Sequence, residues 1–255
     1  RCENCKSSFF IMSSKPNIQV CLVSDLFNNH IISNDTTVVV VDLLRATSVI
    51  STAFHFGIKE IIPVSTLEEA KKYLTNINTI VAAERNAEPI EGFEYGNSPF
   101  QYMNNDISGK TLVLTTTNGT KAINLAKNYN LITASFINSD AVCNYLNSIE
   151  NDILILCSGW KGVFNLEDSI FSGFLVNKLI SKKDYNINCD SALASLELHK
   201  NSKKNYFKFL SNSAHRKRLK HLNIEKDTLF CLNPNITSNI IPTLSNGKLV
   251  RMNLV

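Results

Sequence analysis

The chain has 255 residues, of which 44% are hydrophobic and 19% charged, and its formal net charge is +4. This balance places it among soluble globular proteins, and the length suffices for one large domain or two lobes. No apolar run approaches the roughly 20 residues needed to cross a bilayer, which argues against a membrane protein.

The first 16 residues are predicted to be a disordered tail ahead of a single domain over residues 17–255. The apolar patch at residues 9–12 is shorter than the roughly 7–15 residues of a signal peptide's apolar core, so we expect a cytoplasmic protein. The seven cysteines are scattered and odd in number, which favours a reducing compartment over a disulfide framework. Cys2 and Cys5 form a CxxC pair, but no second pair of ligands completes a zinc site.

The first half of the chain alternates between strand and helix patterns. Val38–Val41 is a run of four β-branched residues without polar alternation, which is typical of a strand buried on both faces. Apolar residues then recur at helical spacing from Ala46 to Gly57, and this predicts a helix. Ser65 and Glu68 form a predicted capping box that opens another helix. Further strands are predicted at 18–23, 60–64 and 79–82.

The second half continues this alternation. Strands are predicted at 111–114, 131–134 and 152–156, and helices follow them. The remainder to about Leu222 is predicted to be helical, with one strand near Thr228–Leu232 and an irregular end. The whole pattern predicts an α/β fold, with a mainly parallel sheet, helices on both faces and three layers. A smaller second lobe from about residue 181 is left open.

Polar side chains follow four of the predicted strands at the point where each strand ends. They are Asp42 with Arg45, Glu84 with Arg85, residues 115–120 and residues 158–162. Because parallel strands end at the same edge of a sheet, we expect these clusters to meet along one rim, where open α/β sheets bind ligands. For one such junction alone helix capping is the favoured explanation, but capping alone does not readily explain four clusters that converge.

The types of residue on this rim suit a phosphate and a divalent metal. The segment Thr115–Thr120 supplies hydroxyls, an amide and a glycine at a helix N-terminus, which favours an anion; an ordinary cap is the alternative. Ser158 and Gly159, with Lys161, form a second candidate anion site; a tight turn is the alternative. Carboxylates beside a phosphate suit Mg²⁺, which usually binds one or two of them together with substrate oxygens and water.

Several enzyme classes lack their motifs in this sequence. There is no GxxxxGK[ST] of a P-loop hydrolase, no GxGxxG after a strand and no GxSxG elbow. The two-aspartate phosphatase signature is also missing, because Leu44 stands two residues after Asp42.

Five motifs in the same order resemble those of the 2-phosphosulfolactate phosphatase family, from roughly Ile18 to the end of the chain. Ser213 and His215 are similar to a late motif of that family. The chain departs from the family pattern at Glu94, where aspartate is usual, and around Ala83 and Asn86, where glycines are common. The five motifs are DLLRATS at 42–48, Glu84-Arg85, GFEYGNSP at 92–99, TTTNGT at 115–120, and the stretch from Cys157-Ser158-Gly159 to Glu167-Asp168.

The resemblance implies Mg²⁺-dependent hydrolysis of 2-phospho-3-sulfolactate to sulfolactate and phosphate, an early step of coenzyme M biosynthesis in organisms that make it. In our hypothesis Asp42 holds the metal with Glu84 or Asp168, while direct attack by Asp42 is an alternative. Arg45 and His215 complete the predicted catalytic set, with His215 as the acid for the leaving alkoxide. The predicted substrate-binding and phosphate-binding residues are Arg85, Asn97, Ser98, Thr116, Thr117, Asn118, Gly119, Thr120, Ser158, Gly159 and Lys161.

Two other functions remain open. One is a phosphatase of similar build that acts on another 2-phospho acid, and the other is a non-catalytic module that binds a phosphorylated acid. The expected partner is a small polyanionic substrate. We expect no nucleic acid, because no recognised motif accompanies the basic cluster at residues 200–220. A homo-oligomer is left open.

Overall fold

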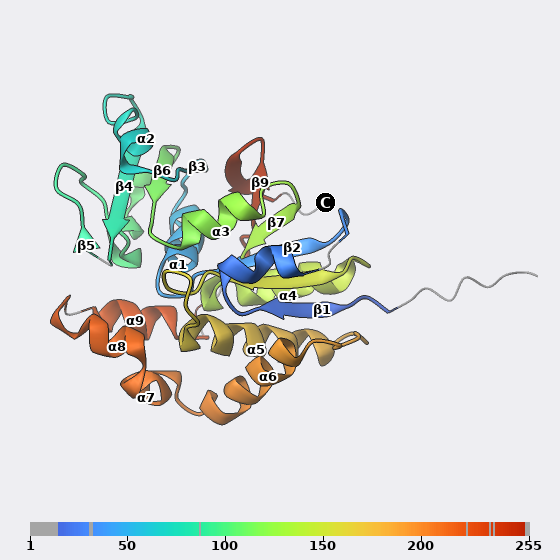
Figure 1. Ribbon diagram of the computed structural model, residues 1–255. Coiled ribbons are helices and arrows are strands. Elements are labelled where there is room, and N and C mark those ends of the chain that lie inside the picture. The colour runs from blue at the N-terminus through green and yellow to red at the C-terminus, as the bar shows by residue number, and fades with distance from the viewer. Residues whose placement is uncertain are drawn as a thin grey trace, which may run out of the picture.

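The computed structural model describes residues 15–30, 33–86, 88–222, 224–234, 236 and 238–252 (Figure 1). Residues 1–14, most of the predicted tail and its CxxC pair, lie outside them. The strands are β1 (Ile18–Cys21), β2 (Thr37–Val41), β3 (Glu60–Pro63), β4 (Thr79–Arg85), β5 (Glu88–Pro89), β6 (Thr111–Thr115), β7 (Asn130–Thr133), β8 (Ile153–Cys157), β9 (Pro242–Ser245) and β10 (Lys248–Arg251). The α-helices are α1 (Ala46–His55), α2 (Leu67–Lys71), α3 (Gly119–Leu125), α4 (Ser139–Ser148), α5 (Leu166–Ile180), α6 (Asp190–Ser202), α7 (Tyr206–Phe209), α8 (Ala214–Arg218) and α9 (Glu225–Cys231).

The strands form one sheet in the order β1-β8-β2-β7-β9-β10-β3-β6-β4-β5. The strands β1, β8, β2 and β7 pair in parallel, and so do β3, β6 and β4. The hairpin β9–β10 joins the two sets through three antiparallel pairings, so the two sets run in opposite senses. The expected mainly parallel α/β sheet is therefore confirmed, but it consists of two parallel sets rather than one.

Helices cover both faces of this sheet, which gives three layers. Along β2, Val39 and Val41 belong to the apolar cluster of α4, α5 and α6, whereas Val38 and Val40 belong to the cluster of α1 and α3. Figure 1 shows α5 and α6 side by side along β1. At Gly173 a Cβ atom would lie 1.8 Å from the carbonyl oxygen of Ser195, so this close packing of α5 on α6 requires glycine.

The segment after residue 181 packs onto the same core as the sheet. Leu196 of α6, Tyr206 of α7 and Leu210 belong to the apolar cluster that contains Ile18 and Ile155. Figure 1 shows α7, α8 and α9 gathered near the end of β4, beside α5. No helix among the described residues has both the length and the apolar character needed to cross a membrane.

Three local predictions were wrong. Residues 228–231, predicted as strand, belong to α9, where Asp227, Thr228 and Cys231 recur on one buried face at helical spacing. The end predicted as irregular forms the β9–β10 hairpin, whose Asn246-Gly247 turn has positive φ at both residues and is a strong hairpin signal in the sequence. The capping box of α2 uses Thr66 and Glu69, one residue later than predicted.

Candidate functional site

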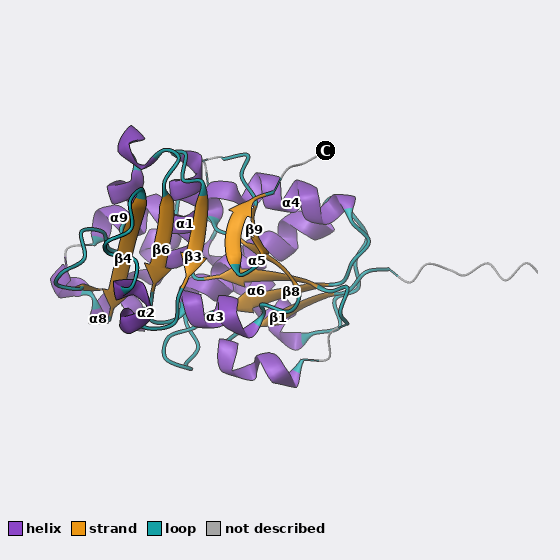
Figure 2. Ribbon diagram, turned by 90° about the horizontal axis from the view of Figure 1, so that it is seen from above, coloured by secondary structure: helices purple, strands orange, loops and turns teal. Residues whose placement is uncertain are grey.

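The carboxyl ends of the two strand sets meet although the sets run in opposite senses. Neighbouring strands twist by about 20–25°, so the five steps from β2 to β6 rotate one set across the other. Figure 2 shows β3, β4 and β6 running across the direction of β1 and β8. Gly119, at the start of the helix after β6, lies against Asp42 after β2, and Thr117 after β6 contacts Glu84 at the end of β4, which places these strand ends together. The predicted rim is present, but twist creates it rather than uniform strand direction.

We call the loops after β2 and β8 the acid side of the rim. Asp42 is 8% exposed and its Oδ1 accepts a hydrogen bond from the Ala46 N–H at 3.3 Å, at the start of α1. It also accepts the N–H of Gly119, the first residue of α3. A Cβ atom at Gly119 would lie 2.8 Å from Oδ2 of Asp42, so glycine is required for this approach. Burial, and then the charge of Asp168, raise the pKa of Asp42.

Asp168, in the first turn of α5, joins the two loops of the acid side. Its Oδ1 accepts the N–H of Leu43 at 2.9 Å, and its Oδ2 accepts the N–H of Gly159 at 3.2 Å and the amide of Asn165 at 3.0 Å. Burial, and then its neighbour Glu167, raise the pKa of Asp168. Both oxygens of Asp168 are therefore already engaged in positioning the loops.

Glu167 is 3% exposed, and its Oε2 has no hydrogen-bond partner among the described residues. Burial is the main cause that raises the pKa of Glu167 to about 7, and the charge of Asp42 adds to it. We expected Glu167, part of the last motif, among the carboxylates of the rim, but it was not among the predicted site residues.

The loops after β4 and β6 form what we call the hydroxyl side. Arg85 donates to the carbonyl of Glu84 at 2.7 Å and to the Thr115 hydroxyl at 2.9 Å. The Thr117 hydroxyl lies 3.4 Å from Oε1 of Glu84 and donates to it. Thr116 and Thr120 exchange hydrogen bonds, and the Thr120 N–H donates to the Thr116 hydroxyl at 3.2 Å. Most of these donors are already paired within the protein.

The loop after β8 reaches the start of α3 through one hydrogen bond. The backbone N–H of Lys161 donates to Oδ1 of Asn118 at 2.9 Å, while the Lys161 side chain is exposed. Gly159 has φ of +68°, and a Cβ atom there would lie 2.7 Å from the carbonyl of Val163. Ser158 is buried, and its hydroxyl has no partner among the described residues.

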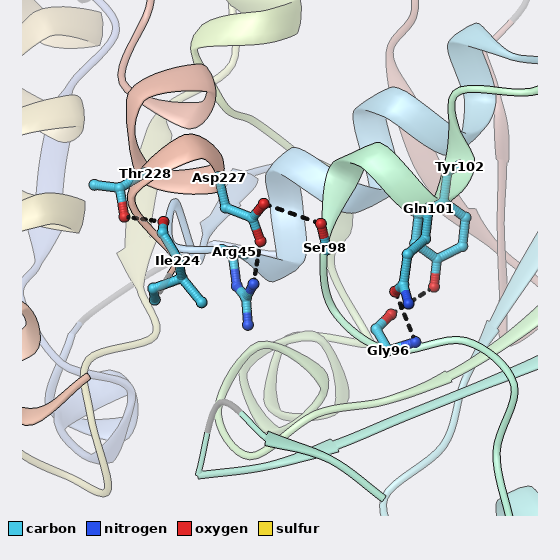
Figure 3. Close-up of polar contacts among 8 residues, drawn as sticks. All are labelled: Arg45, Gly96, Ser98, Gln101, Tyr102, Ile224, Asp227 and Thr228. Carbon is cyan, nitrogen blue, oxygen red and sulfur yellow. Dashed lines mark hydrogen bonds and ion pairs between the residues drawn. The ribbon is translucent and has the colours of Figure 1, made fainter. Parts of the chain in front are cut away.

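Arg45 is buried at the N-terminus of α1 and forms an ion pair with Asp227 of α9 (Figure 3). The other carboxylate oxygen of Asp227 accepts the Ser98 hydroxyl at 3.0 Å. Asp227 therefore connects the predicted residues Arg45 and Ser98, although the sequence analysis missed it. Asn97 is buried, and its side-chain oxygen has no partner among the described residues.

His215 in α8 approaches the acid side from the C-terminal helices. It is 5% exposed, and burial together with the charges of Arg218, Arg45 and Arg216 lowers its pKa to about 3. The imidazole is therefore neutral at pH 7 in the free protein. The predicted role of His215 as an acid would require a bound anion that raises this pKa.

Carboxylates gather on the rim without forming a complete metal cage. Among the described residues, no group of three or more His, Cys, Asp or Glu side chains is arranged to hold a metal by itself. Asp42 and Glu84, with Asp168 behind them, are the acids that the rim brings together. Glu94 is exposed and lines a separate cavity with Thr79 and Lys110, at the opposite end of β4.

The geometry thus brings most of the predicted residues to one rim and adds several that were missed. Glu167, Asn165, Trp160, Arg218 and Asp227 were not among the predicted site residues. The first four lie in or next to the motif stretches. Asp227 lies just before the strand predicted near Thr228–Leu232, in a stretch for which no element was predicted.

Comparison with known proteins identifies the family. The family model described as 2-phosphosulpholactate phosphatase matches residues 21–247. A protein of Thermotoga petrophila named "Probable 2-phosphosulfolactate phosphatase" is 43% identical over 211 residues, which cover 83% of this chain and 90% of that protein. Proteins of the same name from Caldanaerobacter subterraneus subsp. tengcongensis and Clostridium tetani are 38% and 36% identical, over 84% and 91% of this chain and 89% and 98% of their own lengths. The chain therefore belongs to the 2-phosphosulfolactate phosphatase family.

Proposed function

We propose that this chain is a Mg²⁺-dependent phosphomonoester hydrolase that converts 2-phospho-3-sulfolactate to 3-sulfolactate and phosphate. The family supports the phosphatase activity and the substrate, since the relatives carry that enzyme's name. The observation that carries the proposal for the site is the meeting of Asp42 and Glu84 between the acid side and the hydroxyl side.

The charges on the rim fit a divalent cation. Burial, and then the negative charges of Asp168 and Glu84, raise the pKa of Asp42, so its ionised form is disfavoured until a cation binds beside it. Hard carboxylate oxygens suit Mg²⁺. Asp42 and Glu84 would hold the ion, and Asp168 is the further candidate. When bound, Mg²⁺ would neutralise charge on the phosphate oxygens and lower the pKa of a water ligand.

The protein's own residues would orient the substrate beside that ion. Asn118 and the start of α3 would hold the phosphoryl group with Thr117 and Ser158. Arg45, held by Asp227, would supply positive charge next to Asp42. Attack by Asp42 itself, to give an aspartyl phosphate, is the alternative to attack by water.

The test is phosphate release from 2-phosphosulfolactate, from 2-phospholactate and from phosphoglycolate, each with and without EDTA. We expect turnover of 2-phosphosulfolactate that EDTA abolishes and added Mg²⁺ restores. Turnover that persists in EDTA would exclude the metal. Preference for another acid would change the substrate, and tight binding without release would support a binding module instead.

Two broader proposals accompany this function. Five cysteines, at positions 21, 143, 157, 189 and 231, are free thiols, which supports a reducing compartment such as the cytoplasm. Coenzyme M biosynthesis, which the resemblance implies, stays a prediction.

A further inference from the structure

A cavity of about 240 Å³ lies between the loop after β8 and helix α8. We call it the Trp160 cavity. Its lining combines apolar and charged side chains and includes Trp160, Phe164, Glu167, His215 and Arg218. None of these except His215 was expected to contact the substrate.

Three of the residues that line this cavity each have a buried polar side-chain atom without a hydrogen-bond partner among the described residues. These atoms are Nε of Arg218, Nδ1 of His215 and Oε2 of Glu167. Buried polar groups in proteins are nearly always paired, so an unpaired group on a cavity wall indicates a missing water or ligand. Three such atoms around one cavity indicate a place built for a polar group.

The cavity borders the proposed site of hydrolysis. Glu167 interacts electrostatically with Asp42, and it precedes Asp168, which positions the loops of the acid side. His215 interacts electrostatically with Arg45. A substrate whose phosphoryl group lies beside Asp42 therefore has the Trp160 cavity next to it.

The donors on the wall suit an oxyanion. The central carbon of the Arg218 guanidinium lies 3.8 Å from the centre of the Trp160 ring. Stacking of this kind covers a face of the guanidinium, and its N–H groups, which lie in the guanidinium plane, can still donate. Guanidinium groups bind planar or tetrahedral oxyanions through two N–H groups at once. Neutral His215 adds one N–H donor when the proton is on Nδ1. Trp160 and Phe164 supply apolar surface for a methylene group.

Glu167 limits the charge that the cavity accepts. It is the one carboxyl among the residues that line this cavity, and Arg218 is the cation that interacts with it. A singly charged group on the Arg218 side meets less repulsion than a phosphate dianion would. A sulfonate fits this condition, because it is a monoanion with three acceptor oxygens.

We propose that the Trp160 cavity is the specificity subsite for the sulfonate arm of the substrate, with Arg218 as its main donor. This inference rests on the proposed function. 2-Phospholactate is the matched probe, because it carries a methyl group where 2-phosphosulfolactate carries CH₂SO₃⁻ and is otherwise the same molecule.

The experiment compares kcat/KM for these two substrates in the wild type, in Arg218→Met and in Arg216→Met. For Arg218→Met we expect a loss of about 10- to 100-fold with 2-phosphosulfolactate, mainly through KM, as for one charge-assisted contact. The same variant should retain its kcat/KM for 2-phospholactate within about twofold, while Arg218→Lys should lose less on 2-phosphosulfolactate.

Arg216→Met is the matched control. Arg216 lies on the same helix, also stacks on an aromatic ring, that of Phe207 at 4.0 Å, and pairs with Glu225. It lines the neighbouring cavity instead of this one. Its replacement should leave the ratio of the two kcat/KM values unchanged.

Equal losses on both substrates in Arg218→Met would overturn the inference, as would a wild type that does not distinguish them. Failure of the proposed function looks different, because then the wild type would release phosphate from neither substrate. If Arg218→Met does not fold, Arg218→Lys is the deciding variant. If its kcat/KM values for 2-phosphosulfolactate and 2-phospholactate, and therefore their ratio, equal those of the wild type, Arg218 is not a specific sulfonate contact.

Discussion

The two sides of the rim differ in how they treat charge. On the acid side, Asp42, Glu167 and Asp168 all have a pKa raised chiefly by burial, so their ionised forms are held at an energetic disadvantage. On the hydroxyl side, Thr116 and Thr120 pair with each other, and Arg85 pairs with Thr115 and a carbonyl. Its polar groups are mostly satisfied before any ligand arrives.

This difference indicates a division of work. Buried like charges destabilise a folded protein unless a counter-ion or ligand relieves them, and such strain concentrates at functional sites. Satisfied hydroxyl pairs instead stabilise the loop that carries them. We infer that the acid side, with Glu84 beside it, would bind the cation at the expense of stability, and that the Thr116–Thr120 pair of the hydroxyl side stabilises the loop that presents Thr117 and Asn118.

The largest expected effect is that of Asp42→Asn. At saturating Mg²⁺ we expect turnover of 2-phosphosulfolactate to fall by about 10²- to 10³-fold, as for loss of a central electrostatic group. The free energy of unfolding at pH 7 should rise or stay the same, because the pKa of Asp42 is raised and its ionised form is disfavoured in the fold. Steady-state kinetics and urea unfolding measure both.

Asp190→Asn is the control for this variant, because Asp190 is an exposed acid in the first turn of α6. It should change neither quantity. If Asp42→Asn retains near-normal turnover, the acid side does not perform the chemistry, and the comparison between the two sides fails.

A smaller effect, on the pH dependence of stability, is expected from His215. This residue lies among three arginines, with Glu167 also on the wall of the Trp160 cavity; the arginines are Arg218, Arg45 and Arg216. Its pKa is lowered from 6.5 to about 3, so between these values the unfolded chain binds a proton that the folded protein does not. Stability from this residue is therefore present above the unfolded pKa and is lost as the pH falls. Relative to His215→Gln, the wild type should gain about 1.5 kcal/mol in unfolding free energy between about pH 5 and pH 6.5.

The buried acids, whose raised pKa values favour stability at low pH, contribute alike to the wild type and to His215→Gln. Taking the difference between the two unfolding free energies therefore removes their contribution. Urea unfolding in EDTA at several pH values measures this difference. If this difference does not change with pH, the pKa of His215 is the same in the folded and the unfolded protein. The arginines around His215 would then not lower its pKa, and the comparison between the two sides would lose this part.

The acid side was the more predictable of the two from sequence, for a physical reason. Four valines that end at Asp42 mark a strand buried on both faces, and the carboxyl end of such a strand is a local pattern. Gly159 likewise comes soon after β8, which pairs with β2, and Asp168 lies in the first turn of the helix that follows. The clusters after β4 and β6 were found by the same signal, although the reversal of their strands by the β9–β10 hairpin was not.

The contacts from the C-terminal helices could not be found in this way. Asp227 is 182 positions from Arg45, and no local periodicity encodes a pairing over that separation. Residues 228–231 are β-branched or apolar and suit a strand as well as a helix. Their contacts with distant residues, such as that of Cys231 with Ser48 of α1, are not encoded in this local pattern. Arg218 belonged to a run of basic residues that the sequence alone does not distinguish from a solvated surface.

The third expected effect is on stability instead of turnover, the reverse of the first, and it belongs to the hydroxyl side. Thr116→Val keeps the shape of a buried side chain but removes the acceptor of the Thr120 N–H, so we expect a loss of about 1–2 kcal/mol in unfolding free energy. Turnover should stay within about threefold of the wild type. Thr133→Val is the matched control, because the Thr133 hydroxyl is buried without a partner among the described residues, and its removal should be neutral or stabilising. If Thr116→Val instead abolishes turnover and leaves stability unchanged, the hydroxyl of Thr116 takes part in the reaction, and the division of work between the two sides is wrong.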